Sequence, residues 1–330
     1  MPLPSIRPLL AAAALLLAAC ETPPTLAPLL KDDSPERPTA IQESVVTSSG
    51  FNGLAPFEAR VMVLTRPDMR REQNTLRGTG TMSRLLIGNE DRATVTRLDQ
   101  QRLWEIDVGR GEYRDCPLTG CPTRRSIERA PAPGGRLEPG CRMRVVGRDQ
   151  QLRSTGAQQE INGWRAAQTQ IVLTIELEDQ AGRRSTSTLN ADLWTTPATA
   201  AMQAAHAIEQ RFEQDAARAQ RAAAVARVPT ELRDLVDSLL AEAMSAQDRV
   251  ALFDLERDLA GVSGQPVRTA LRWDVRGEAC GGTGLGPAAR LLGGGDAPLF
   301  AITHELRRFE VAPVRDSQFY LPTHYRRSAP

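Results

Sequence analysis

The sequence predicts an α+β fold in which antiparallel strands flank a central block of helices. Three observations lead to this expectation. Apolar and polar residues alternate with a period of two up to Trp194, which is the pattern of half-buried strands. From Pro197 onward apolar residues instead recur every three or four positions, as on one face of a helix. The period of two then returns after Pro266.

The cleanest alternation lies in Ile171–Glu178, where the turn Asp179–Gly182 leads into Ser185–Trp194 and predicts a hairpin. An irregular loop is expected from Pro117 to about Gly140, because this stretch is rich in Pro, Gly and Arg. The other strands expected are Phe57–Thr65, an extended run from Gly78 through Ile87, Ala93–Leu98, Trp104–Val108, Val267–Val275 and Phe300–Leu306.

The central helices are predicted from their apolar stripes. The first carries Met202, Ala205, Ile208 and Phe212 on one face. A second begins near its candidate cap Thr230 and continues to Ala243, and a shorter one covers Val250–Ala260. Their polar faces carry mixed charges, so we expect these stripes to pack on a core and not on a membrane surface.

The first nineteen residues have the features of a secretory signal. Arg7 precedes an apolar run, Leu9–Ala19, that is shorter than the roughly 20 residues needed to span a bilayer. Leu17-Ala18-Ala19-Cys20 resembles the bacterial lipobox, in which the cysteine thiol receives diacylglycerol and the cysteine becomes the N-terminus. The alternatives are an ordinary signal with an incidental cysteine, or an uncleaved anchor. We favour lipidation of Cys20 because position, flanking residues and nucleophile agree.

The residue after Cys20 bears on location. In Gram-negative lipoproteins an Asp there retains the protein at the inner membrane, and this chain has Glu21. The resemblance therefore favours the outer membrane, with the protein facing the periplasm and held to the membrane by lipid. The organisation expected is a signal peptide (1–19), the lipidated Cys with a Pro-rich tether (20–45), and a single domain (46–330) with a helical insert near 198–260.

Composition limits the partners and the chemistry. A formal net charge of +1 gives no electrostatic reason to expect a nucleic acid partner. The glycine-rich stretch Gly282–Gly286 lacks the lysine of a phosphate loop. Nucleophile elbows, metal-ligand spacings and paired His/Cys arrangements are missing, so we expect neither an enzyme nor a cofactor or metal.

Four cysteines accompany Cys20: Cys116, Cys121, Cys141 and Cys280. An even number in an oxidising compartment suggests two disulfides, with three possible pairings. One pairing closes Cys116 on Cys121 and joins Cys141 to Cys280. The alternative, a zinc site, is disfavoured because none of the three histidines lies beside a cysteine.

Four segments, taken in order, resemble the LolA/LolB-like superfamily of bacterial lipoprotein carriers and their relatives: Ala93–Leu118, Gly156–Trp194, Phe253–Val267 and Val311–Arg326. The resemblance implies a strongly curved antiparallel sheet, an incomplete β-barrel, with helices covering its open side. The chain departs from this pattern in its cysteines, its long helical insert and its glycine-rich late loop. No acyl-holding residue can be carried over one by one.

Two functions follow from these features. The first is binding of an acyl chain, a lipoprotein or another hydrophobic molecule, with candidate lining residues Trp104, Ile106, Leu173, Ile175, Leu271 and Trp273. For any one of them ordinary core packing is the alternative. The second is a structural or adaptor lipoprotein that contacts another envelope component through the helical insert and the loop Arg124–Arg136.

Overall fold

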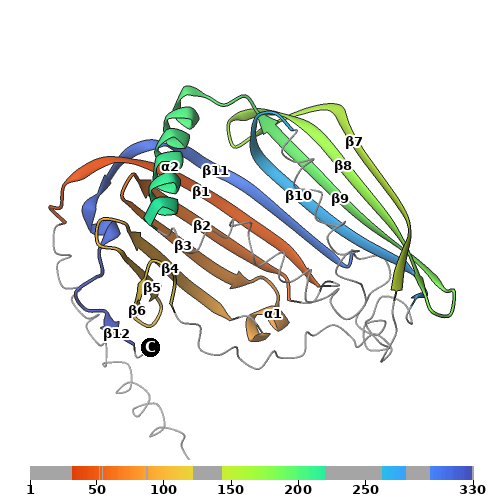
Figure 1. Cartoon of the computed structure of the whole chain (residues 1–330), viewed down its shortest axis with the longest axis horizontal. Helices are drawn as coiled ribbons and strands as arrows, with labels where there is room; N and C mark the ends of the chain where they lie inside the picture. The colour runs from red at the N-terminus through yellow and green to blue at the C-terminus, as the bar shows by residue number, and fades with distance from the viewer. Residues whose placement is uncertain are drawn as a thin grey trace, which may run out of the picture. The chain divides into compact units, whose positions relative to one another are not determined.

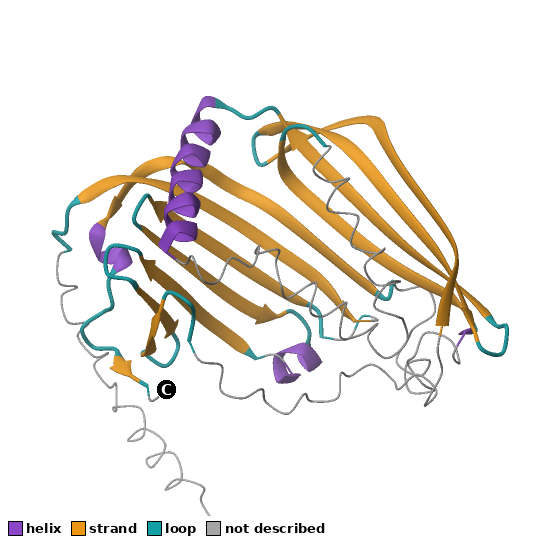
Figure 2. Ribbon diagram, in the orientation of Figure 1, coloured by secondary structure: helices purple, strands orange, loops and turns teal. Residues whose placement is uncertain are grey.

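The computed structural model describes residues 32–51, 53, 55–86, 88–121, 143–219, 262–279 and 298–328. The chain divides into two units, Met1–Pro35 and Glu36–Pro330. Every described strand and helix lies in the second unit. Of the described residues 64% are in strands and 14% in helices. Figure 2 shows the strands in orange and the helices in purple.

One twelve-stranded sheet forms the body of the second unit (Figure 1). Its strand order is β12-β6-β5-β4-β3-β2-β1-β11-β10-β9-β8-β7. Neighbouring strands are antiparallel except β12 and β6, which are parallel. The strands are β1 (Glu36–Phe51), β2 (Phe57–Arg66), β3 (Met69–Gly78), β4 (Asn89–Arg97), β5 (Arg102–Asp107), β6 (Glu112–Pro117), β7 (Met143–Ile161), β8 (Trp164–Asp179), β9 (Arg184–Thr196), β10 (Gln265–Gly277), β11 (Phe300–Arg315) and β12 (Arg326–Arg327).

The predicted α+β fold, an incomplete barrel covered by helices, is wrong for this structure. The sheet is open and mixed, and it dominates the described residues. They contain only two α-helices, α1 (Thr81–Leu86) and α2 (Ala200–Ala219), and the 3₁₀ helix Asp316–Phe319. The helices predicted after residue 229 lie outside the described residues. Sequence patterning also missed long polar strands such as β7, whose side chains are mostly exposed and need no apolar alternation.

Most of the predicted strands are confirmed, as are the hairpin of β8 and β9 and the helix at Met202–Phe212. The extended run through Ile87 is wrong, because α1 occupies it. The Ser83 hydroxyl accepts a hydrogen bond from the Gly80 N–H (2.6 Å) and donates one to the Gly80 carbonyl (2.8 Å), which closes this turn. A Cβ at Gly78 would lie 2.6 Å from the Ser83 backbone, so only glycine fits this close approach. Residues 36–45, assigned above to the tether, form part of β1.

The two faces of the sheet follow from its register, because directly paired residues point to the same side. We call face A the side that carries Gln42, Leu306 and Leu271, and face B the side that carries Ile41 and Val95. Helix α2 packs on face A, mainly against β11, β1 and β2. The core beneath it contains Ala40, Ile161, Ala166, Met202, Ala205, Val267, Leu306 and Phe309.

The C-terminal residues cover part of face B. Phe319 is fully buried there against Ile41, Leu64 and Met69. Leu321 and Tyr325 then pack on a second buried cluster, which contains Ala93, Val95, Trp104 and Ile106. The tail thus covers face B of β1 to β5, whereas α2 lies on face A of β11, β1 and β2.

Face B of β7 to β10 is largely polar. Glu178 accepts charge-assisted hydrogen bonds from Arg144 on β7 and Arg184 on β9. Arg272 and Asp274 form a further ion pair on β10. The alternation in these strands therefore separates a polar face B from an apolar face A.

Candidate functional site

The six predicted lining residues do not meet at one site. Trp104 and Ile106 lie on face B in β5, inside the packed cluster under the C-terminal tail. Leu173 and Ile175 in β8, with Leu271 and Trp273 in β10, lie on face A. The structure therefore places Trp104 and Ile106 in a core on the opposite side of the sheet from the other four.

The four face-A candidates belong to a larger group of apolar residues on β8, β9 and β10. We call it the face-A patch: Ile171, Leu173, Ile175, Leu177, Leu189, Ala191, Leu193, Leu271 and Trp273. Its members in β8 are nearly inaccessible, with Ile171 0% and Leu173 2% exposed. The indole N–H of Trp273 donates a hydrogen bond to the Ser187 hydroxyl at 2.7 Å, which satisfies the polar atom of this side chain. The patch comprises two apolar clusters, and both are separate from the core under α2.

A cleft of about 500 Å³ opens between α2 and strands β1 to β3. It is lined by Gln42, Val63, Arg70, Glu72, His206, Glu209, Gln210, Glu213 and Gln214. Val63 is the only apolar side chain among these nine. None of the six predicted lining residues borders this cleft. An acyl chain in this cleft would bury the polar wall groups without giving them hydrogen bonds, so the cleft does not suit that ligand.

The polar side chains of this cleft attach α2 to the sheet. Arg70 on β3 forms an ion pair with Glu213, and its guanidinium lies 4.4 Å from the centroid of the Phe212 ring. On the other side His206 Nε2 lies 2.6 Å from Gln265 Oε1, and its ring meets Phe309 edge to face at 4.6 Å. Arg70 and His206 thus connect α2 to the sheet around the polar cleft, in addition to the apolar core that contains Met202 and Ala205.

Burial raises the pKa of the Glu209 carboxyl in this cleft, and repulsion from Glu213 adds to it, although Arg70 and His206 act in the opposite direction. The folded state therefore binds this proton more tightly than the unfolded state, and the associated stability is lost as the pH rises through the raised pKa. We expect Glu209→Gln to unfold at higher urea concentration than the wild type at neutral pH. The difference should shrink as the pH falls below the usual glutamate pKa of about 4.3. If the urea midpoints of the wild type and Glu209→Gln differ by the same amount from about pH 4 to about pH 8, the assignment of a raised pKa to Glu209 is contradicted.

One of the disulfide pairings left open by the sequence is present. Cys116, at the end of β6, is joined to Cys121 with a Cα–Cα distance of 4.9 Å. The loop between them turns at Gly120, whose φ is 104°, and buries Leu118 against Phe212 and Ala216 of α2. Closing so short a loop contributes about 2 kcal/mol in the chain-entropy model. Cys20, Cys141 and Cys280 lie outside the described residues.

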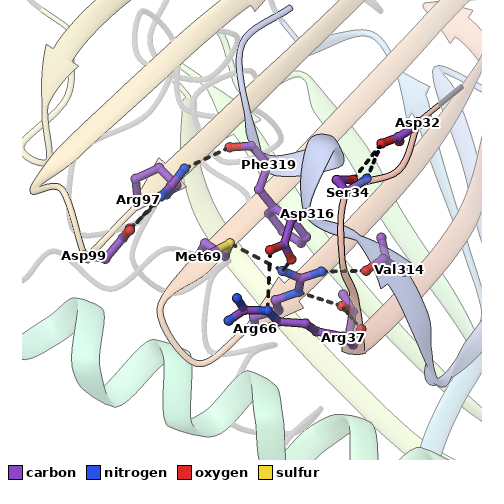
Figure 3. Close-up of polar contacts among 11 residues, drawn as sticks. Asp32, Ser34, Arg37, Arg66, Met69, Arg97, Asp99, Val314, Asp316 and Phe319 are labelled. Atoms are coloured by element: carbon purple, nitrogen blue, oxygen red, sulfur yellow. Dashed lines mark hydrogen bonds and ion pairs between the residues drawn. The ribbon is translucent and has the colours of Figure 1, made fainter. Parts of the chain in front are cut away.

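A buried ion pair that sequence patterning missed joins the C-terminal tail to the sheet (Figure 3). The Arg66 guanidinium donates to Asp316 Oδ1 at 2.5 Å, to the Val314 carbonyl at 2.7 Å and to the Thr39 hydroxyl at 2.9 Å. The Arg66 side chain is only 4% exposed, and its guanidinium lies 4.5 Å from the centroid of the Phe319 ring. Arg66 and Asp316 are 250 residues apart in the chain, so no local pattern signals their contact.

Arg97 on β4 makes a second contact of this kind. It pairs with Asp99 at 2.6 Å and donates to the Phe319 carbonyl at 3.3 Å. The hydrogen bond to Asp99 is the main cause that raises the pKa of Arg97, and it lowers the pKa of the Asp99 carboxyl. Both arginines connect the tail to the sheet.

Within the described ranges no group of three or more His, Cys, Asp and Glu residues is arranged to hold a metal ion. The described helices include none that is long and apolar enough to cross a membrane. Comparison of the chain with protein-family models, curated proteins and solved structures finds no match.

Proposed function

We propose that this chain is a lipid-anchored envelope protein that binds an acyl chain or another hydrophobic molecule against the face-A patch. The observation that carries the proposal is the grouping of Leu173 and Ile175 of β8 with Leu271 and Trp273 of β10 on one face of the sheet, on either side of β9 and apart from the core under α2. An apolar wall is the chemistry that accepts an alkyl chain, and each methylene removed from water contributes about 0.8 kcal/mol.

The anchor in this proposal is the lipid on Cys20, and the location is the periplasmic side of the outer membrane. The support is the sequence Leu17–Cys20 and the Glu that follows it. The LolA/LolB-like resemblance supports the same assignment through the order of its segments. Its implied helix-covered half-barrel is not part of the proposal, because the sheet described here is open.

The test uses two substitutions at adjacent positions of β8. Leu173→Trp adds volume to the face-A patch, whereas Val172→Trp adds it to face B of the same strand. The full chain is extracted from membranes in mild detergent, and bound lipid is measured by mass spectrometry. We expect lipid with the wild type and with Val172→Trp, and several-fold less with Leu173→Trp.

The overpacked Leu173→Trp variant is expected to lose about 1–3 kcal/mol of stability, so near-ultraviolet circular dichroism must first show that it is folded. A second variant, Leu271→Trp on β10, probes the same patch from another strand. Equal lipid in all four proteins, or none in the wild type, would contradict the proposal.

A structural or adaptor role is the second candidate, and one observation favours it. Strand β7 ends the sheet with side chains that are mostly exposed, including Leu152. Edge strands of this kind offer backbone groups to a protein partner. In that case the purified chain would carry no lipid and would be recovered in a complex with a protein partner.

A further inference from the structure

Strand β7 is a long strand at the edge of the sheet. Among the described strands it pairs only with β8, along most of its 19 residues. Figure 1 shows it as the outermost strand on the side opposite β12. Leu152, near its middle, is 52% exposed. A long edge strand is a template on which another strand can pair.

The regular part of β7 is short and well defined. The register to β8 shifts between Val145 and Gly147 and again between Ser154 and Gln158. Bulges of this kind bend the strand and increase its twist, so straight pairing with a further strand is confined to Gly147–Ser154. Gln151 lies close to the middle of that segment.

Three exposed residues of this segment point to face B. Asp149, Gln151 and Arg153 pair with Thr174, Val172 and Gln170 of β8, which also lie on that face. The Asp149 carboxylate accepts a hydrogen bond from the Gln151 amide (2.8 Å), and the Arg153 Nε donates one to the Gln170 side chain (3.0 Å). Both contacts are exposed, so the Asp149 and Arg153 side chains can exchange these partners for others at little cost in free energy.

The charges in this segment are self-complementary. In an antiparallel pair of two β7 strands with a two-fold axis at Gln151, Asp149 of each copy faces Arg153 of the other. If the register shifts by one or two residues in either direction, neither Asp149 nor Arg153 faces a residue of opposite charge. One of these shifts places Arg148 opposite Arg153 of the other copy. Directly opposed unlike charges stabilise cross-strand pairs and like charges destabilise them, so the sequence favours this register over the neighbouring ones.

We propose that two copies of this chain associate by antiparallel pairing of β7 with β7, with the two-fold axis at Gln151. The contact is isologous, as two-fold dimers require, and it joins two twelve-stranded sheets into one. The two exposed Leu152 side chains lie diagonally across the seam on face A, within reach of each other. The association does not depend on the proposed binding of a hydrophobic molecule.

Charge reversal tests the register. The full chain is prepared in detergent as wild type, Asp149→Arg, Arg153→Asp and the double variant that exchanges the two charges, and its association is measured by sedimentation. Each single reversal should weaken dimerisation by at least about tenfold, because it opposes like charges at two symmetric positions. The double variant should restore it, since the exchange recreates both unlike pairs.

Cross-linking tests the position of the axis independently. Gln151→Cys places two thiols opposite each other, and a short bismaleimide linker should join them into a covalent dimer above the background of the wild-type cysteines. Gln159→Cys on the same strand is the control, because a rise of about 3.3 Å per residue places its two copies roughly 50 Å apart. A monomeric wild type, equal association of all four charge variants, or equal cross-linking at both cysteines would overturn the proposal.

Discussion

Replacing Asp316 by alanine is expected to lower the free energy of unfolding by about 3–5 kcal/mol, because it leaves the buried Arg66 guanidinium without its counter-ion. The Arg66 side chain is 4% and the Asp316 side chain 12% exposed, so water cannot take over the lost contact. Arg37, also an ion-pair partner of Asp316 at 3.4 Å, loses its contact as well. Urea denaturation of the full chain measures the effect.

Two comparisons separate this effect from a general loss of charge. Asp274→Ala removes the partner of Arg272, whose side chain is half exposed, and should cost less than about 1 kcal/mol. The double variant Arg66→Met with Asp316→Ala removes both buried charges and should be more stable than Asp316→Ala alone. A double variant less stable than the single would show that the Asp316 effect does not arise from an uncompensated Arg66.

Phe319→Ala is expected to lower the free energy of unfolding by a similar amount, about 3–5 kcal/mol, because it opens a cavity in the core on face B. Phe319 is fully buried against Ile41, Leu64 and Met69. It also carries the Arg66 guanidinium over its ring, and that contact adds a cation–π term. The same urea titration measures the loss.

The neighbouring residue provides the control for Phe319. Tyr320 is 45% exposed, and its ring contacts only the Arg97 guanidinium among the cation–π pairs of the described residues. Tyr320→Ala should therefore cost much less than Phe319→Ala. Equal losses from the two substitutions would contradict the assignment of Phe319 as the residue that holds the tail on the sheet.

Sequence patterning located strands wherever one face is apolar and the other polar. The hairpin of β8 and β9 was predicted because Ile171–Glu178 separates the face-A patch from the polar face B. Strand β7 has no such contrast, because its side chains are mostly exposed. The run before Ile87 has an extended-like composition, but the close approach of Gly78 to Ser83 makes it a helical turn. Local contacts between Ser83 and the glycines at 78 and 80, which apolar–polar alternation does not encode, decided that segment.

For the candidate site, the sequence predicted which residues of one strand share a face, but not which strands contribute to the same face. A period of two shows that Trp104 and Ile106 share a face, and that Leu271 and Trp273 share a face. It does not show whether these are the same face, because that depends on the register of all the strands between β5 and β10. The ion pair of Arg66 with Asp316 was not foreseen, since its two residues meet only when the tail folds back over the sheet.

Labelling with a photoreactive fatty acid tests the proposed binding surface most directly. The full chain in mild detergent is irradiated with a diazirine-bearing acyl chain, and the modified residues are identified by peptide mass spectrometry. The predicted result is adducts on the face-A patch, at Leu173, Ile175, Leu271 or Trp273. Their amount should be reduced in Leu173→Trp and unchanged in Val172→Trp. Adducts confined to face B, or spread evenly over both faces of β8 and β10, would contradict the account.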